Sequence, residues 1–217
     1  MKQGTIRSES TREHILKNAW KEIYEQGLHN ASLERIARGC GLTKGALFHY
    51  FDSKDALVFG VLRDVMHRYM AAKWFEPLLT NADPLEAVRA ILRDYRKNTN
   101  EQTVCRGCPL QNLAHDVTFS EPKIQTAIKE MFFELETQIT VAFRKAAQSH
   151  VDVESIGRKI VASFYGAVIL GKVHRSKKVF DEQLENLERD LLTAFHSRKS
   201  KTRSSRKKHI SPLGVNA

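Results

Sequence analysis

Hydrophobic residues recur along almost the whole chain with the spacing of amphipathic helices. In the stretch from about Glu9 to Gln26 they share one helical face. That face consists of Ile15, Leu16, Ala19, Trp20, Ile23 and Tyr24. Gly27 follows at the position where helices commonly end. No stretch alternates hydrophobic and polar residues as a strand does, so the pattern predicts an all-α fold.

Two short helices joined by a tight turn are predicted between Ser32 and Phe51. The hydrophobic face of the first consists of Leu33, Ile36 and Ala37. Gly39 and Gly41 then supply the backbone freedom of a sharp turn, and Thr43 is placed to cap the second helix. Helix, glycine-bearing turn and helix is the DNA-binding helix-turn-helix arrangement, whose second helix enters the major groove.

The second of these helices has side chains suited to contact DNA. Lys44 places a charge at its start, and Gly45 is small enough for the backbone to approach bases or phosphates closely. An ordinary charged surface hairpin has the same spacing, so spacing alone leaves both interpretations open. The candidate DNA-binding residues are Arg7 in the polar N-terminal arm, Ser32, Thr43, Lys44, Gly45, Ala46, Leu47, His49, Tyr50 and Lys54.

The rest of the chain is predicted to form further helices. A long helix capped by Ser53 is expected to end at Pro77. Asp83 and Pro84 open the next one as cap and first residue, and the polar stretch Asn98 to Thr103 is expected to be a loop. A later helix capped by Asp152 contains three glycines, for which close helix packing is the predicted reason. They are Gly157, Gly166 and Gly171.

A long run of residues from Arg7 to about Tyr69 carries a resemblance to a known family. It includes Thr11, His14, Gly27, Ser32, Ile36, Ala37, Gly41, Leu42, Thr43, Lys44, Gly45, Leu47, His49, Tyr50, Phe51, Ser53, Lys54 and Leu57. This run resembles the TetR/AcrR family of transcriptional regulators, and the remainder is similar in layout only. The family often has a tyrosine where this chain has Phe48, and its hydroxyl commonly contacts a phosphate. The departure shifts the expected contacts to His49, Tyr50 and Lys54.

The resemblance implies about nine helices, with three in an N-terminal head and six in a ligand-binding and dimerisation body. Expected boundaries are 9–69 for the helix-turn-helix domain, 70–197 for the body and 198–217 for a basic tail. The last two helices, roughly Asp152 to Ser176 and Asp181 to His196, would form a homodimer interface. A cavity for an unidentified small-molecule effector would be lined by aromatic residues that are equally suited to a plain core. They are Trp74, Tyr95, Phe132, Phe164 and Tyr165.

The formal net charge of +10 is concentrated at the C-terminus. Seven of the 35 basic residues lie between Arg198 and Lys208, and no acidic residue follows Asp190. Because this tail is rich in Lys, Arg and Ser, we predict that it is disordered from Arg198 and adds a salt-sensitive term to DNA affinity. No apolar run is long enough to span a membrane or act as a signal, so a cytoplasmic protein is expected.

Cys105 and Cys108 form a CxxC pair with three candidate chemistries. A zinc site needs about four ligands, and only Cys40 and His115 are further candidates, so no metal is predicted. A thiol–disulfide enzyme would need a βαβ setting, which the helical pattern does not provide. A regulatory thiol is the third, because Cys108 is expected at an accessible helix N-terminus beside Arg106, where its pKa would be lowered. The competing interpretation is a structural one, with both cysteines as small apolar residues at a turn.

Together these features predict a DNA-binding transcriptional regulator, specifically a repressor released by a small ligand or by thiol modification. Its expected partners are double-stranded operator DNA, a second copy of the chain and the effector, with no membrane. A nonspecific nucleic-acid-binding protein and a thiol–disulfide enzyme are the alternatives. No nucleophile elbow, phosphate loop or HExxH pattern is present, so neither enzymatic activity nor a cofactor is predicted.

Overall fold

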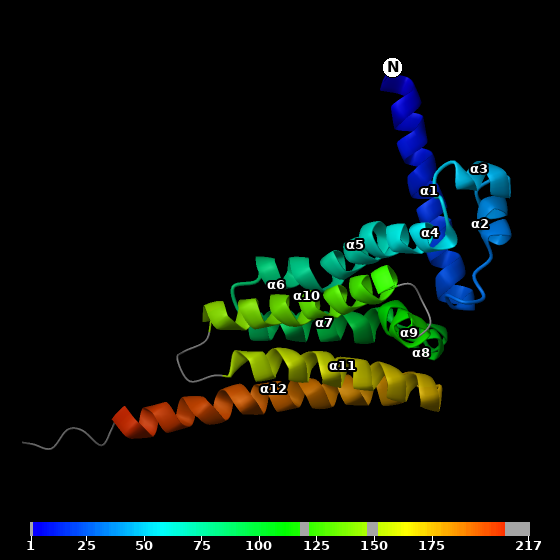
Figure 1. The fold of residues 1–217 in the computed structure, drawn as a ribbon. Coiled ribbons are helices and arrows are strands. Elements are labelled where there is room, and N and C mark those ends of the chain that lie inside the picture. The colour runs from blue at the N-terminus through cyan, green and yellow to red at the C-terminus, as the bar shows by residue number, and fades with distance from the viewer. Residues whose placement is uncertain (1, 118–121, 147–151, 207–217) are drawn as a thin grey trace, which may run out of the picture.

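The computed structural model describes residues 2–117, 122–146 and 152–206, and every regular element within these ranges is a helix. The prediction of an all-α fold is therefore confirmed. The N-terminal head contains α1 (Lys2–Gln26), α2 (Leu33–Gly39) and α3 (Lys44–Phe48). Figure 1 shows α2 and α3 beside α1, which stands upright above the helices of the body.

A continuous helical rod leads from the head into the body. Its segments are α4 (Lys54–Gly60), the π-helical η1 (Val61–Met66), α5 (His67–Met70), the π-helical η2 (Ala71–Phe75) and α6 (Glu76–Thr80). The prediction that this helix ends at Pro77 is wrong. Pro77 has no N–H to donate, but the π-helical turn directly before it changes the hydrogen-bond register, so the helix continues through the proline.

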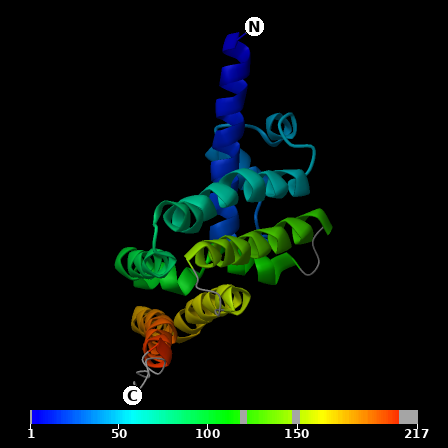
Figure 2. The same ribbon diagram turned by 90° about the vertical axis from the view of Figure 1, so that its left-hand side faces the viewer.

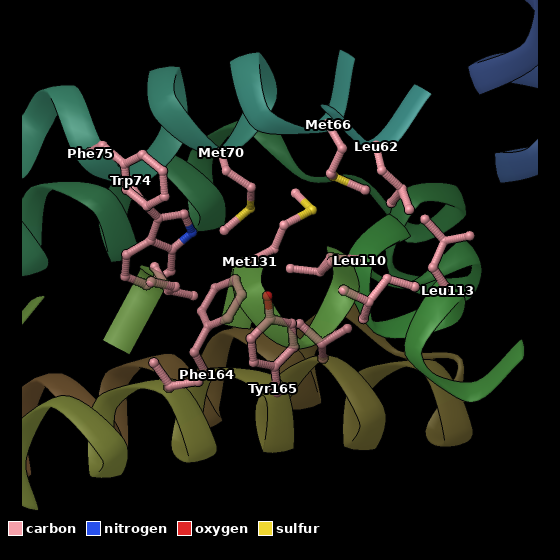
Figure 3. Packing of buried hydrophobic residues seen from close by; sticks show 14 of the residues in the cluster. Leu62, Met66, Met70, Trp74, Phe75, Leu110, Leu113, Met131, Phe164 and Tyr165 are labelled. Atoms are coloured by element: carbon pink, nitrogen blue, oxygen red, sulfur yellow. The ribbon is translucent and has the colours of Figure 1, made fainter. Parts of the chain in front are cut away.

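The body is layered beneath this rod, as Figure 2 shows, with α7 and α10 in the middle and α11 and α12 lowest. Its helices are α7 (Pro84–Asn98), α8 (Glu101–Arg106), α9 (Pro109–Asp116), α10 (Pro122–Ala146), α11 (Val153–His174) and α12 (Lys177–Arg206). In Figure 3, Met70 and Trp74 of the rod point down toward Phe164 and Tyr165 of α11. Trp74 and Phe164 meet edge to face, with ring centroids 5.0 Å apart.

Side-chain caps define where the helices of the body begin. The Asp83 carboxylate accepts from the N–H groups of Leu85 and Glu86, and Asp152 accepts from that of Ser155 (3.0 Å). A loop was predicted for residues 98–103, but residues 101–103 are helical. Asn100 caps a helix there, because its Oδ1 accepts from the N–H of Thr103 (2.9 Å), and α8 begins at Glu101.

Both ends of the chain are more helical than predicted. α1 begins at Lys2, where a polar arm was expected as far as Ser8, and α12 continues to Arg206. The prediction of disorder from Arg198 is therefore wrong as far as Arg206, and residues 207–217 of the predicted tail lie outside the described residues. Lys and Arg are good helix formers, so a charged segment can extend a helix that is already anchored by packing.

Two of the three glycines in α11 are required by packing, as predicted. A Cβ on Gly157 would collide with the hydroxyl of Thr140 and lie 3.1 Å from the Glu136 carbonyl oxygen on α10. A Cβ on Gly171 would lie 2.8 Å from Phe180 Cβ on α12. For Gly166 the expectation fails within one protomer, since nothing lies within 4 Å of a Cβ built there. None of the helices in the described ranges combines the length and hydrophobicity needed to cross a bilayer.

Candidate DNA-binding surface and junction cavity

The helix-turn-helix is formed as the sequence predicts. Ser32 and Thr43 are the N-caps of α2 and α3, and Thr43 Oγ1 accepts from the N–H of Ala46 (3.1 Å). Gly41 in the connecting turn has φ +68°, a backbone conformation that glycine adopts without strain. Ser53 caps α4 by accepting from the N–H of Ala56 (3.0 Å). The rod therefore starts at a fixed position after α3.

One face of α3 is packed and the opposite face is exposed. Leu47 is fully buried, Phe51 is buried just after the helix, and Ala46 is half-buried. The exposed face has the spacing i, i+1, i+4 and i+5, which is one side of a helix. It consists of Lys44, Gly45, Phe48 and His49. The side chain of Leu47, one of the predicted DNA-binding residues, therefore serves the core.

Lys44 is held by a carboxylate from the first helix of the motif. Its Nζ donates to Oε1 of Glu34, and both side chains are about half exposed. The hydrogen bond from Lys44 lowers the pKa of Glu34 to about 2. At neutral pH Glu34 is therefore ionised and orients Lys44 on this surface. Because the pair is exposed, its contribution to stability is small.

The other predicted DNA-binding residues lie off the exposed face of α3. Tyr50 is half-buried and packs against the core. Lys54 Nζ donates to the backbone oxygen of His29 (3.2 Å), so it holds the loop between α1 and α2. The Ser32 hydroxyl donates to Glu34 (3.1 Å). Arg7 lies on α1, and its side chain is outside the described residues.

A cavity of about 280 Å³ lies where the head meets the body. Its walls come from α1, the rod, α7, α8, the turn before α9, α11 and α12. The aromatic lining consists of Trp20, Tyr24, Tyr69, Tyr95, Phe164 and Phe180. The polar lining consists of Lys73, Asp94, Asn98, Thr99 and Thr103. A mostly apolar cavity with a few convergent polar groups is the usual form of a small-molecule site.

The aromatic residues predicted to line a cavity separate into two groups. Tyr95 and Phe164 line it, whereas Trp74, Phe132 and Tyr165 do not and pack in the core. Trp20, Tyr24 and Tyr69 also line the cavity but were not predicted from the sequence, because Trp20 has the spacing of an ordinary core position. The sequence feature that indicates this wall is the pair of aromatic residues at 20 and 24, which share one face of a helix.

Hydroxyl groups around the cavity keep their protons. Burial raises the pKa of Tyr24, that of Tyr95 well above its usual value and that of Tyr69 to about 12. The Tyr24 hydroxyl donates to the backbone oxygen of Gly107 (3.1 Å), and Trp74 Nε1 donates to the Tyr95 hydroxyl (3.2 Å). At neutral pH the wall therefore offers neutral hydroxyl groups to a bound molecule.

The charged groups of the cavity neutralise each other. Lys73 Nζ lies 2.8 Å from Asp94 Oδ2, and this hydrogen bond lowers the pKa of Asp94. The Lys73 ammonium also lies 5.8 Å from the centroid of the Tyr95 ring. The two charged side chains at the polar end of the cavity, Lys73 and Asp94, are therefore paired with each other, and neither is an uncompensated charge.

Known proteins match both halves of this architecture. Residues 15–61 match the family model described as bacterial regulatory proteins, tetR family, and residues 84–185 match one described as transcriptional regulator LmrA/YxaF-like, C-terminal domain. The chain belongs to the TetR family of transcriptional regulators. The first match covers the helix-turn-helix, and the second covers α7 to α11 and the first part of α12.

Two relatives above 30% identity each match less than half of this chain. The HTH-type transcriptional regulator UidR of Escherichia coli is 38% identical over 72 residues, which are 33% of this chain and 36% of UidR. The chain thus matches about a third of that relative. The HTH-type transcriptional repressor Rv1474c of Mycobacterium tuberculosis is 31% identical over 103 residues, covering 44% of this chain and 55% of that protein.

A solved TetR-family structure from Cytophaga hutchinsonii superimposes with a TM-score of 0.76 at 18% identity. The superposition covers 87% of this chain and 96% of the Cytophaga protein. At this identity the likeness shows the fold alone, which is a helix-turn-helix head on a helical body.

The prediction that the pKa of the Cys108 thiol is lowered is wrong. Cys108 does precede α9 as its N-cap, but its side chain makes no capping hydrogen bond and it lies on the cavity wall. Burial raises the pKa of the Cys108 thiol, because the thiolate would lose its hydration. Cys105 and Cys108 are both free thiols and are both half-buried. The structure therefore favours the structural interpretation of this pair.

Proposed function

We propose that the protein is a homodimeric repressor that binds operator DNA through α3 and is released by a small molecule in the junction cavity. The observation that carries this proposal is the exposed face of α3, which belongs to no core and lies in a matched TetR-family head. A related protein from Mycobacterium tuberculosis is named as a repressor, which supports that direction of regulation. The protein acts by binding and not by catalysis.

The proposed dimer uses the outer side of α11 together with α12. Gly166, Leu170 and Val173 lie four and three residues apart, so they share one side of α11. Leu170 is 39% exposed and Val173 is 71% exposed, and Gly166 has open space above it. Small and apolar residues on one side of a long helix suit close packing against a second copy. Two copies would then present two α3 helices to one palindromic operator.

The effector would act on the head through α9. In the turn before this eight-residue helix, Gly107 and Cys108 line the cavity. The backbone oxygen of Gly107 also accepts a hydrogen bond from the Tyr24 hydroxyl of α1. At its other end Asp116 Oδ2 accepts from the N–H of Leu28 (2.9 Å). His29 Nε2 donates to the backbone oxygen of Asp116 (2.9 Å). A molecule that displaces the turn would therefore move both attachments of the head.

The test of DNA recognition is selection of bound sites from random double-stranded DNA. We expect a palindrome with two half-sites about one helical turn apart or a multiple of it, because a symmetric dimer places two α3 helices on one side of the duplex. Retention of all sequences alike, with binding lost at moderate salt, would contradict the proposal. That result would favour nonspecific nucleic-acid binding.

The role of α9 is tested by filling the cavity genetically. Val168→Trp places a bulky ring in the cavity from α11 and is expected to weaken operator binding about tenfold, within the usual range of allosteric coupling. In an Asp116→Ala background, which removes the side-chain contact with Leu28 and keeps the backbone contact with His29, the same filling is expected to have a smaller effect. Asp116→Asn keeps an acceptor oxygen for the Leu28 N–H and should restore the full effect.

The measurement is fluorescence anisotropy with labelled operator, and thermal unfolding of each variant verifies that it is folded. An equal loss on cavity filling with and without Asp116 would contradict transmission through α9. Such a result would leave operator recognition itself intact.

A further inference from the structure

A phenylalanine, Phe48, lies partly exposed on the face of α3 that the proposed function places against DNA. Phe48 is 40% exposed, whereas Leu47 before it and Phe51 after the helix are buried. A single exposed apolar residue is ordinary on a protein surface. Phe48 is of interest because it shares its exposed face with Lys44, Gly45 and His49, the residues proposed to lie against DNA.

Gly45, three residues before Phe48, is not required by the fold. Its φ is not positive, and a Cβ built there would meet nothing closer than Thr43 Oγ1 at 3.9 Å. Glycine inside a helix costs about 1 kcal/mol relative to alanine, so the protein gives up stability at this position. Within the described residues no side chain packs closely against Gly45, so its bare backbone is available to an external partner. It lets the groove of a duplex come close enough to meet the ring of Phe48.

The chemistry of Phe48 limits what it can contact on DNA. Its ring has no hydroxyl and cannot hydrogen-bond a phosphate or the polar edge of a base. The apolar group that the major groove exposes is the C5-methyl of thymine, and phenylalanine is among the side chains that contact it. Lys44 on the same face, which Glu34 orients, has an ammonium group that can donate to a phosphate.

We propose that Phe48 reads a thymine methyl group in each operator half-site and thereby determines sequence preference. This inference rests on the proposed function, since it needs α3 to lie in the major groove. Because a ring without a hydroxyl has no hydrogen bond to offer a phosphate, its contribution on this face is apolar contact with a base.

The test replaces each thymine of the selected operator in turn by deoxyuridine, which lacks only the methyl group. Wild-type protein is expected to lose about fourfold in affinity at one thymine per half-site, the value of one buried methyl-sized group. Phe48→Ala should bind less tightly overall and show no loss at that thymine. Phe48→Leu keeps an apolar side chain at this position and should keep the sensitivity.

His49→Ala is the matched control, because it alters a neighbour on the same face and leaves Phe48 in place. It should keep the methyl sensitivity at the position where Phe48→Ala loses it. Thermal unfolding and salt-dependent binding to random DNA verify that each variant is folded and still engages phosphates.

The outcomes separate this inference from the proposed function. A selected operator that is insensitive to deoxyuridine at every thymine overturns the inference and leaves operator binding established. Equal sensitivity of wild type and Phe48→Ala at every thymine also overturns it, because the methyl group is then read by another residue. If no sequence is selected at all, the proposed function itself fails.

Discussion

Replacing Gly157 by alanine is expected to lower the free energy of unfolding by about 1–3 kcal/mol, the usual cost of overpacking a well-packed interface. The added methyl would collide with the Thr140 hydroxyl and lie 3.1 Å from the Glu136 carbonyl oxygen, which belongs to the α10 backbone and cannot rotate away. α10 and α11 must then move slightly apart, which weakens the packing between these two helices. Chemical denaturation of purified protein measures the change.

Gly166 provides the matched control on the same helix. Nothing in the protomer lies within 4 Å of a Cβ at this position, so alanine should be neutral or stabilise α11 by up to about 1 kcal/mol. If α11 packs against a second copy, the same change should weaken dimerisation in sedimentation experiments. A loss of protomer stability in Gly166→Ala comparable with that in Gly157→Ala would contradict the packing described here.

Local signals in the sequence predicted the head well because its helix boundaries depend on neighbouring residues. The hydroxyl groups of Ser32, Thr43 and Ser53 each accept a hydrogen bond from the backbone N–H three residues later. Such caps can be predicted directly from the sequence. The same holds for Asp83 and Asp152 in the body. The helix end predicted at Pro77 was wrong, because the helix can continue through this proline only after the π-helical turn before it, and no local sequence feature indicates that turn.

The cavity was less predictable because its wall combines residues far apart in sequence. Trp20 and Tyr95 meet across it only after the head has docked on the body. Periodicity identifies which residues are buried, but it does not distinguish a filled core from a cavity lined by the same residues. The thiol of Cys108 shows the same limit, since the helix N-terminus was visible in sequence while the burial that raises its pKa was not.

Replacing Gly45 by glutamate is expected to weaken operator binding on the order of 100-fold, because like charges brought together at an interface cost several kcal/mol. The new carboxylate would project from the exposed face of α3 toward the phosphates and bases of the groove. Within the protein there is room for it, since a Cβ at Gly45 has no contact below 3.9 Å. Glutamate is also a better helix former than glycine, so the thermal stability should rise or stay unchanged.

Gly45→Gln separates the effect of charge from that of size. Glutamine has nearly the same shape without the charge, so its loss of affinity reports the space that the groove needs against the bare backbone. Glutamate should show the same loss plus an electrostatic part that shrinks as salt is added. Anisotropy titrations at several salt concentrations separate the loss of affinity due to size from that due to charge, and melting temperatures report the stability of each variant.

Wild-type operator affinity in Gly45→Glu would show that this face of α3 does not enter the groove. A lowered melting temperature in both variants would instead place Gly45 among residues that the fold requires.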